Sequence, residues 1–275
     1  MTSQYRGRLA PTPTGELHLG HARTFQAAWQ RAVAAGGELV LRIEDLDAAR
    51  CRPEYTEQAI EDLRWVGLRW TEGPLYQSER RAVYCDVWRR LHSAGLIYPS
   101  KLSRKDVRNA ALAPHDDEEG GEAIFPAALR APAEAALAYD DPAGVTWRFR
   151  VPDGERIAFD DVRQGSQGFT AGVDFGDFVV WRKDDVPAYE LAVVADDIAM
   201  RITEVVRGED LLKSTARQLL LYRALAAEPP SWCHEPLVRD AEGKRLAKRH
   251  QALSLRTLRE RGVDWREALA AMGVS

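Results

Sequence analysis

The chain has 275 residues, of which 45% are hydrophobic and 29% are charged, and its net charge is −4. This composition excludes a collagen-like or largely disordered chain, and no apolar run reaches the roughly 18 residues of a membrane span. The first residues lack the apolar core of a secretory signal, and the cysteines are too few and scattered for a disulfide framework. We therefore expect a cytoplasmic protein without a membrane partner.

The first part of the chain alternates strand and helix patterns. Residues 5–10 predict a short strand, which a proline-rich run at 11–15 ends. A helix from Leu19 to Ala35 follows and stops at a pair of glycines, and the apolar run 38–44 predicts a second strand. Strand, helix and strand at this spacing indicate a βαβ unit of a parallel sheet. Further helices are expected at 53–66 and 79–94.

The second part of the chain changes character and then returns to this pattern. Strand-like alternation predicts an antiparallel patch made of residues 144–150, 156–159 and 177–181. The parallel pattern resumes with a helix at 188–200, a strand at 202–206 and a helix at 210–226. We predict an α/β fold, a Rossmann-type open parallel sheet with a small inserted α+β subdomain. The halves of the sheet would be residues 1–99 and 188–275, and the insert residues 100–187.

Two histidines open the first predicted helix. His18 and His21 share one helix face, so both can donate to the same anion, and Gly20 between them lets a flat ligand approach the backbone. A helix N-terminus also attracts phosphate. Taken alone, the two histidines are more often ordinary surface side chains of an amphipathic helix. The proline-rich turn before them favours instead a site that stabilises charge during nucleotidyl transfer.

A second candidate is the basic run Gly243-Lys-Arg-Leu-Ala-Lys-Arg-His250. Four basic side chains within it could neutralise a triphosphate. It could equally be a solvated basic loop, which is the usual role of such runs.

Charged residues also follow the predicted strands, at the edge where ligands of open parallel sheets bind. Arg8, Glu44 and Arg207 would meet there, together with Tyr189. Two guanidiniums and one carboxylate suit a zwitterion that carries an extra carboxylate. An internal salt bridge between arginine and glutamate explains these residues equally well at this point.

Taken in order, these segments resemble the class I aminoacyl-tRNA synthetases, specifically the glutamyl branch. His18-Leu-Gly-His21 resembles the HIGH motif, Arg245-Leu-Ala-Lys-Arg249 resembles the KMSKS loop, and Arg8 to Gly15 is similar to the signature Arg-Phe-Ala-Pro-Ser-Pro-Thr-Gly. Further blocks match at 42–45, 187–197 and 206–210. The stretch after Arg249 is too short for an anticodon-binding region, so the chain resembles the truncated branch, the glutamyl-queuosine tRNA(Asp) synthetases.

This resemblance implies ATP-dependent activation of L-glutamate and its transfer to the cyclopentenediol of queuosine in the anticodon of tRNA(Asp). It implies Mg²⁺ with ATP, and we expect a monomer. His18, His21 and Lys248 would be catalytic. The residues implied for glutamate are Arg8, Leu9, Ala10, Pro11, Thr12, Glu44, Tyr189 and Arg207. Those implied for ATP are His18, Gly20, His21, Arg245, Leu246, Ala247, Lys248 and Arg249.

The chain departs from the family pattern at two places. Arg245 and Ala247 replace the lysine and serine of the KMSKS loop, and the lost hydroxyl predicts weaker loop closure. Many relatives also carry zinc-binding cysteines, whose positions here hold non-ligands or a poor ligand. We therefore predict no zinc and expect apolar packing in its place. The degenerate positions are Ser100, Leu102, Phe125 and Leu129.

Three other functions remain open. The first is a truncated glutamyl-tRNA synthetase that charges tRNA(Glu), and the second is a non-catalytic tRNA-binding paralogue. Retention of His18, His21, Glu44, Arg207 and Lys248 disfavours the second. The third is a small-molecule nucleotidylyltransferase that shares only the HIGH-type turn, which would activate some other carboxylate.

Overall fold

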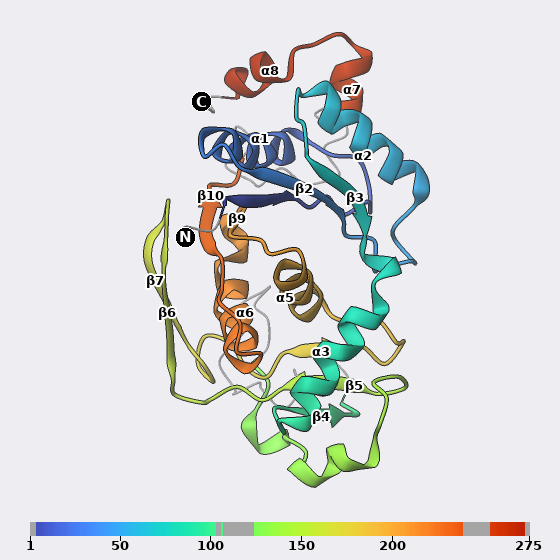
Figure 1. Cartoon of the computed structure of the whole chain (residues 1–275), viewed down its shortest axis with the longest axis vertical. Helices are drawn as coiled ribbons and strands as arrows, with labels where there is room; N and C mark the ends of the chain where they lie inside the picture. The colour runs from blue at the N-terminus through green and yellow to red at the C-terminus, as the bar shows by residue number, and fades with distance from the viewer. Residues whose placement is uncertain (1–3, 103–105, 107–123, 239–253, 273–275) are drawn as a thin grey trace.

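The computed structural model describes residues 4–102, 106, 124–238 and 254–272, which form an α/β fold (Figure 1). Strands β1 (Arg6–Leu9), β2 (Glu38–Ile43) and β3 (Glu72–Tyr76) pair in parallel, in that order. Helix α1 (Leu19–Ala34) joins β1 to β2, and α2 (Pro53–Trp65) joins β2 to β3. The predicted βαβ unit is confirmed.

A second parallel pair lies beside β1. Strand β9 (Glu204–Gly208) pairs in parallel with β10 (Ser231–Glu235). The backbone N–H of Thr203 donates to the carbonyl of Arg6 at 2.8 Å, and the N–H of Arg6 donates to Oγ1 of Thr203 at 2.8 Å. The carboxyl ends of β1, β2 and β9 therefore open toward one edge, as a Rossmann-type sheet requires.

Helices and short turns complete this half of the molecule. Helix α5 (Tyr189–Ala199) precedes β9, while the 3₁₀ turn η4 (Glu209–Leu211) and α6 (Leu212–Ala224) lead from β9 to β10. Figure 1 shows the C-terminal helices α7 (Leu255–Glu260) and α8 (Trp265–Ala271) at the end of the molecule that α1 and α2 occupy. Helix α1 turns one apolar stripe toward the core. That stripe consists of Leu19, Ala22, Phe25, Ala28 and Ala32.

Residues 97–181 form two separate groups of strands. One is an antiparallel sheet in the order β4 (Ile97–Ser100), β5 (Thr146–Phe149) and β8 (Val179–Trp181), packed near α3 (Arg81–Ser93). The other is a hairpin of β6 (Arg156–Asp161) and β7 (Gly165–Thr170). The remaining short elements are the 3₁₀ turns η1 (Gln77–Glu79), η2 (Ala127–Leu129) and η3 (Ala133–Ala138).

The expectation that 144–150, 156–159 and 177–181 form one antiparallel patch is wrong for its middle member. Strand β6 pairs with β7 and, in parallel, with β10, where Asp161 lies opposite Trp232. The reason is its partner: β7 has the sequence Gly-Ser-Gln-Gly-Phe-Thr, which lacks apolar alternation and is not predictable as a strand. With that partner, β6 extends the sheet of β9 and β10.

Two large hydrophobic clusters hold these layers together. One lies around α1, β1, β2, α7 and α8, and the other around α3, α5, β5 and β8. Trp88, Trp147 and Trp181 are fully buried in the second cluster. None of the helices in the described ranges combines the length and apolar character that a bilayer span requires. The division of the chain into 1–99, 100–187 and 188–275 stays a prediction.

Candidate active site

The N-terminus of α1 is capped by the histidines of the HIGH-like motif. His18 is the N-cap residue, and its Nδ1 accepts from the backbone N–H of Gly20 at 3.1 Å. Nδ1 of His21 accepts in turn from the backbone N–H of His18 at 3.1 Å. The two rings stack with their centroids 3.8 Å apart. Because each Nδ1 is an acceptor, the proton of each neutral ring lies on Nε2.

Gly20 packs closely against the ring of this cap. A Cβ at this position would lie 3.0 Å from Cε1 and 3.1 Å from Nδ1 of His18. A larger residue would therefore displace the ring that caps the helix. The contact between Gly20 and the His18 ring was not predicted from the sequence, which explained the glycine only by the approach of a ligand.

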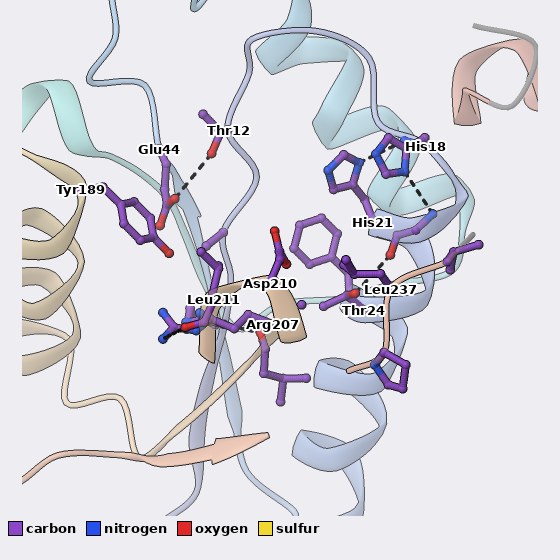
Figure 2. Close-up of a pocket in the computed structure, with 18 residues that line it drawn as sticks. Thr12, His18, His21, Thr24, Glu44, Tyr189, Arg207, Asp210, Leu211 and Leu237 are labelled. Atoms are coloured by element: carbon purple, nitrogen blue, oxygen red, sulfur yellow. Dashed lines mark hydrogen bonds between the residues drawn. The ribbon is translucent and has the colours of Figure 1, made fainter. Parts of the chain in front are cut away.

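The strand ends and the cap surround one cavity of about 370 Å³. Figure 2 shows Glu44 and Tyr189 on one side and the stacked rings of His18 and His21 on the other, with Asp210 between them in this view. Most of the predicted site residues line this cavity. They are Arg8, Ala10, Thr12, His18, Gly20, His21, Glu44, Tyr189 and Arg207.

Glu44 is held at the end of β2 by a buried arginine. Its Oε1 accepts from Nη2 of Arg42 at 3.1 Å, and its side chain is 10% exposed. Oγ1 of Thr12 lies 3.5 Å from Oε2 of the same carboxylate. Burial raises the pKa of Glu44, while the Arg42 and Arg8 guanidiniums oppose that shift.

The two arginines of the cavity have no carboxylate partner among the residues that the structure describes. Nη1 of Arg8 donates to the carbonyl of Val206 at 2.8 Å, and its buried Nε has no hydrogen-bond partner among the described residues. Arg207 is buried as well and donates only to neutral acceptors there. Within the described ranges, neither side chain forms an ion pair. The internal salt bridge between arginine and glutamate does occur at Glu44, but its partner is Arg42 and not Arg8 or Arg207.

Other predicted residues lie elsewhere. Leu9 is buried in the core, and Pro11 is a backbone partner, because its carbonyl accepts from the N–H of Glu44 at 3.0 Å. The residues of the KMSKS-like segment lie outside the described residues; they are Arg245, Leu246, Ala247, Lys248 and Arg249. Both flanks of their segment are nevertheless at the cavity, since Val238 lines it and Ser254 forms a backbone bridge with His18.

Several cavity residues were not predicted. Thr24 and Phe25 lie one turn beyond the HIGH-like motif on α1, where helical spacing would have indicated them. The segment after β10 had no motif to mark it. The lining residues without a predicted role are Thr24, Phe25, Val206, Gly208, Asp210, Leu211, Pro236, Leu237 and Val238.

The degenerate zinc region is an apolar cluster. Phe125 packs with Tyr98, and Leu102 and Leu129 pack against them. The guanidinium of Arg148 lies over the Phe125 ring at 4.3 Å. Ser100 is buried at the end of β4. The expected apolar packing is present, and no group of three or more metal-ligating side chains occurs within the described ranges.

Comparison with known proteins identifies the family. The family described as tRNA synthetases class I (E and Q), catalytic domain, matches residues 4–273. The chain belongs to this family. Membership implies the use of ATP, an amino acid and tRNA, and it accounts for the parallel sheet whose strand ends meet at the HIGH-like motif.

Relatives within the family fall into two groups. The glutamyl-Q tRNA(Asp) synthetase of Nitratidesulfovibrio vulgaris is 47% identical over 268 residues, which cover 94% of this chain and 82% of that protein. The glutamate–tRNA ligase of Desulfosudis oleivorans is 40% identical over 260 residues, 93% of this chain and 53% of that protein. The crystal structure of the glutamate-tRNA synthetase from Elizabethkingia anophelis superposes with a TM-score of 0.76 at 30% identity, over 90% of this chain and 53% of that one.

Proposed function

We propose that this chain activates L-glutamate with ATP and transfers it to queuosine in the anticodon of tRNA(Asp). The observation that carries this proposal is the meeting of Arg8, Glu44 and Arg207 in one cavity with His18 and His21. A carboxylate pocket and a phosphate-binding helix end thus face the same space. The similarity to glutamyl-Q tRNA(Asp) synthetases over most of their length supports the choice of acceptor.

Glutamate matches the charges of the cavity. Arg8 and Arg207 carry positive charge that no described carboxylate neutralises directly, so they suit a substrate carboxylate. Glu44 would accept from the α-ammonium, with Arg42 holding it in place. Tyr189 and Thr12 border Glu44 and would close this end of the site.

ATP would lie at the other end of the cavity. The Nε2–H groups of His18 and His21 would donate to phosphate oxygens, at a helix end that already favours anions. Lys248 and its neighbours would reach the phosphates from the segment between Val238 and Ser254. Mg²⁺ would enter with ATP, because this ion is held mainly by phosphate oxygens and water in such sites.

The chemistry needs positioning more than a protein nucleophile. An oxygen of the α-carboxylate of glutamate attacks the α-phosphorus of ATP, the bond from that phosphorus to the oxygen that bridges the α- and β-phosphates breaks, and pyrophosphate leaves. A queuosine hydroxyl then attacks the glutamyl carbonyl, and AMP leaves with the electrons of the anhydride bond. In both steps the site would align the reactants and stabilise developing negative charge. We also propose a monomer that works in the cytoplasm, where ATP and tRNA occur.

Two assays test this proposal. ATP–pyrophosphate exchange should depend on L-glutamate and should proceed without tRNA. Labelled glutamate should then pass to tRNA(Asp) that carries queuosine and not to the same tRNA lacking it. Absence of glutamate-dependent exchange would overturn the proposal in favour of a binding module, and exchange with another carboxylate would favour a nucleotidylyltransferase.

A second candidate is the charging of tRNA(Glu). It is favoured by similarity to glutamate–tRNA ligases, of which the chain spans about half, as for the 53% covered in the Desulfosudis oleivorans protein. Attachment of glutamate to the 3′ end of tRNA(Glu), with none on queuosine, would establish this candidate.

A further inference from the structure

Arg207 is surrounded by neutral acceptors. Its Nε donates to Nε2 of His234 at 3.0 Å, and its Nη1 donates to Oε1 of Gln218 at 3.0 Å. Nη2 donates to Oγ1 of Thr215 at 2.7 Å and to the carbonyl of Leu211 at 3.3 Å. The guanidinium is therefore fixed on three sides without an ion pair in the described part of the chain.

Two of these acceptors, His234 and Gln218, are themselves hydrogen-bonded to a carboxylate. Oδ2 of Asp161 lies 2.6 Å from Nδ1 of His234. Oε2 of Glu190 accepts from Nε2 of Gln218 at 2.7 Å. A neutral ring and a neutral amide thus separate Arg207 from these two carboxylates.

The hydrogen bonds define the protonation of His234. Because Arg207 can only donate, Nε2 must be the acceptor, and the single ring proton lies on Nδ1, from which it is donated to Asp161. Burial lowers the pKa of His234 to about 4, and the adjacent Arg207 charge acts in the same direction. The ring is neutral at physiological pH.

Asp161 itself cannot turn away. Its Oδ1 accepts from the backbone N–H groups of Arg163 and Gln164 at 2.9 Å and 2.8 Å, and from that of His234 at 3.2 Å. These bonds tie the end of β6 to β10 and lock the carboxylate against the ring. The hairpin of the inserted region thus reaches the amino-acid end of the cavity from behind.

Structural arginines elsewhere in the chain are built differently. Arg31 donates to both carboxylate oxygens of Glu204 at 2.6 Å, and Arg42 donates to Asp197 at 2.6 Å. In those pairs the carboxylate neutralises the guanidinium directly. A pair of that kind at Arg207 would leave little attraction for an incoming anion.

We propose that His234 is a positioning residue for Arg207, with Asp161 fixing its tautomer, so that the guanidinium is immobilised while its charge stays available to a substrate carboxylate. This inference rests on the proposed function, because glutamate supplies that carboxylate. It adds two buried residues, distant in sequence, that act on glutamate only through Arg207.

A matched pair of variants at His234 separates the two bonds of the ring. In His234→Gln, Oε1 can replace Nε2 as the acceptor for Arg207, whereas in His234→Asn the shorter amide can reach only Asp161. We expect the KM for glutamate in pyrophosphate exchange to rise about 10- to 100-fold in His234→Asn and by less than about 3-fold in His234→Gln. The KM for ATP should stay unchanged in both.

A second pair tests whether the charge must stay unpaired. Thr215→Asp places a carboxylate beside Nη2 of Arg207, and Thr215→Asn places an amide of the same shape there. Both can hold the guanidinium. The KM for glutamate should rise more than about 10-fold in Thr215→Asp relative to Thr215→Asn, because only the former neutralises the charge. This pair still tests the requirement for an unpaired charge if His234→Asn does not fold.

The outcomes are distinguishable from failure of the proposed function. Wild-type exchange is measured first, and its absence overturns the function rather than the positioning role. If the wild type is active, equal effects of His234→Gln and His234→Asn on the KM for glutamate, or parallel changes in the KM for ATP, overturn the role of the ring nitrogen. Equal KM values in Thr215→Asp and Thr215→Asn overturn the role of the charge.

Discussion

Arg42 links Glu44 to Asp197: its Nη2 donates to the first carboxylate at 3.1 Å and its Nη1 to the second at 2.6 Å. The arginine side chain is 0% exposed. Two carboxylates from different halves of the chain thus depend on one buried cation. Glu44, which we propose to bind the ammonium of glutamate, is therefore held by an arginine that also pairs with Asp197 on α5.

Replacing Arg42 should therefore destabilise the fold. Arg42→Gln removes the cation that donates to both Asp197 and Glu44, which should lower the free energy of unfolding by about 3–5 kcal/mol. Urea denaturation at neutral pH measures it. Arg50→Gln is the control, because that side chain is 72% exposed in its pair with Asp47, and it should cost less than about 1 kcal/mol. Equal costs would contradict the role of burial.

Glu44→Gln should weaken glutamate binding selectively. The amide keeps the shape but loses the charge that would pair with the ammonium, so we expect the KM for glutamate to rise about 10- to 100-fold with little change in the KM for ATP. Burial raises the pKa of Glu44, so this side chain should become protonated at a higher pH than an ordinary glutamate side chain. The wild-type KM for glutamate should therefore begin to rise, on acidification, at a pH above the usual range of such a side chain. A wild-type pH profile that matches that of Glu44→Gln would argue against this role.

Asp62 on α2 should make stability depend on pH. Its side chain is 0% exposed, and burial raises its pKa from 3.8 to about 7, although Nη1 of Arg259 lies 3.5 Å away. Between these values the folded state binds more protons than the unfolded state. Its contribution to stability is therefore present below about pH 4 and is lost as the pH rises through about 7.

Asp62→Asn removes this titration. Relative to the wild type, the variant should gain about 2–4 kcal/mol of unfolding free energy between pH 5 and pH 8.5. Guanidinium denaturation of both proteins at these two pH values measures the difference. A difference that does not change with pH would show that Asp62 stays ionised in the folded protein.

The apolar cluster in place of a zinc site predicts a metal-independent protein. Purified protein should contain less than about a tenth of an equivalent of zinc, and a chelator should not shift its Tm. Phe125→Ala should lower the unfolding free energy by about 3 kcal/mol. Leu137→Ala is the control, because Leu137 is 80% exposed. One bound equivalent of zinc would refute the prediction.

The parts of the site that lie on regular elements were predictable. Arg8 and Arg207 lie near the carboxyl ends of short strands and Glu44 follows an apolar strand directly. The ends of parallel strands meet at one edge of a sheet. The two glycines after α1 and the apolar sequence of β2 likewise make the first βαβ unit predictable. Their convergence follows from topology, which the pattern of strands and helices already determines.

The support behind Arg207 was not predictable. Strand β10 is short and mixed, with the sequence Ser-Trp-Cys-His-Glu, and β7 is polar and rich in glycine. Without these strands, Asp161 and His234 have no reason to be neighbours. Strand β3 was missed for a similar reason, because its Gly73-Pro74 pair reads as a turn.

The stacked cap at the start of α1 has a consequence for how the chain can change. The imidazole of His18 accepts from the N–H of Gly20 in the first turn of the helix, and that of His21 accepts from the N–H of the N-cap residue His18. Loss of either ring should fray the first helical turn and also remove a proposed contact to phosphate. A substitution at either position therefore affects both stability and substrate binding. Any rate measured for such a variant has to be compared at equal helicity, or unfolding will be mistaken for lost chemistry.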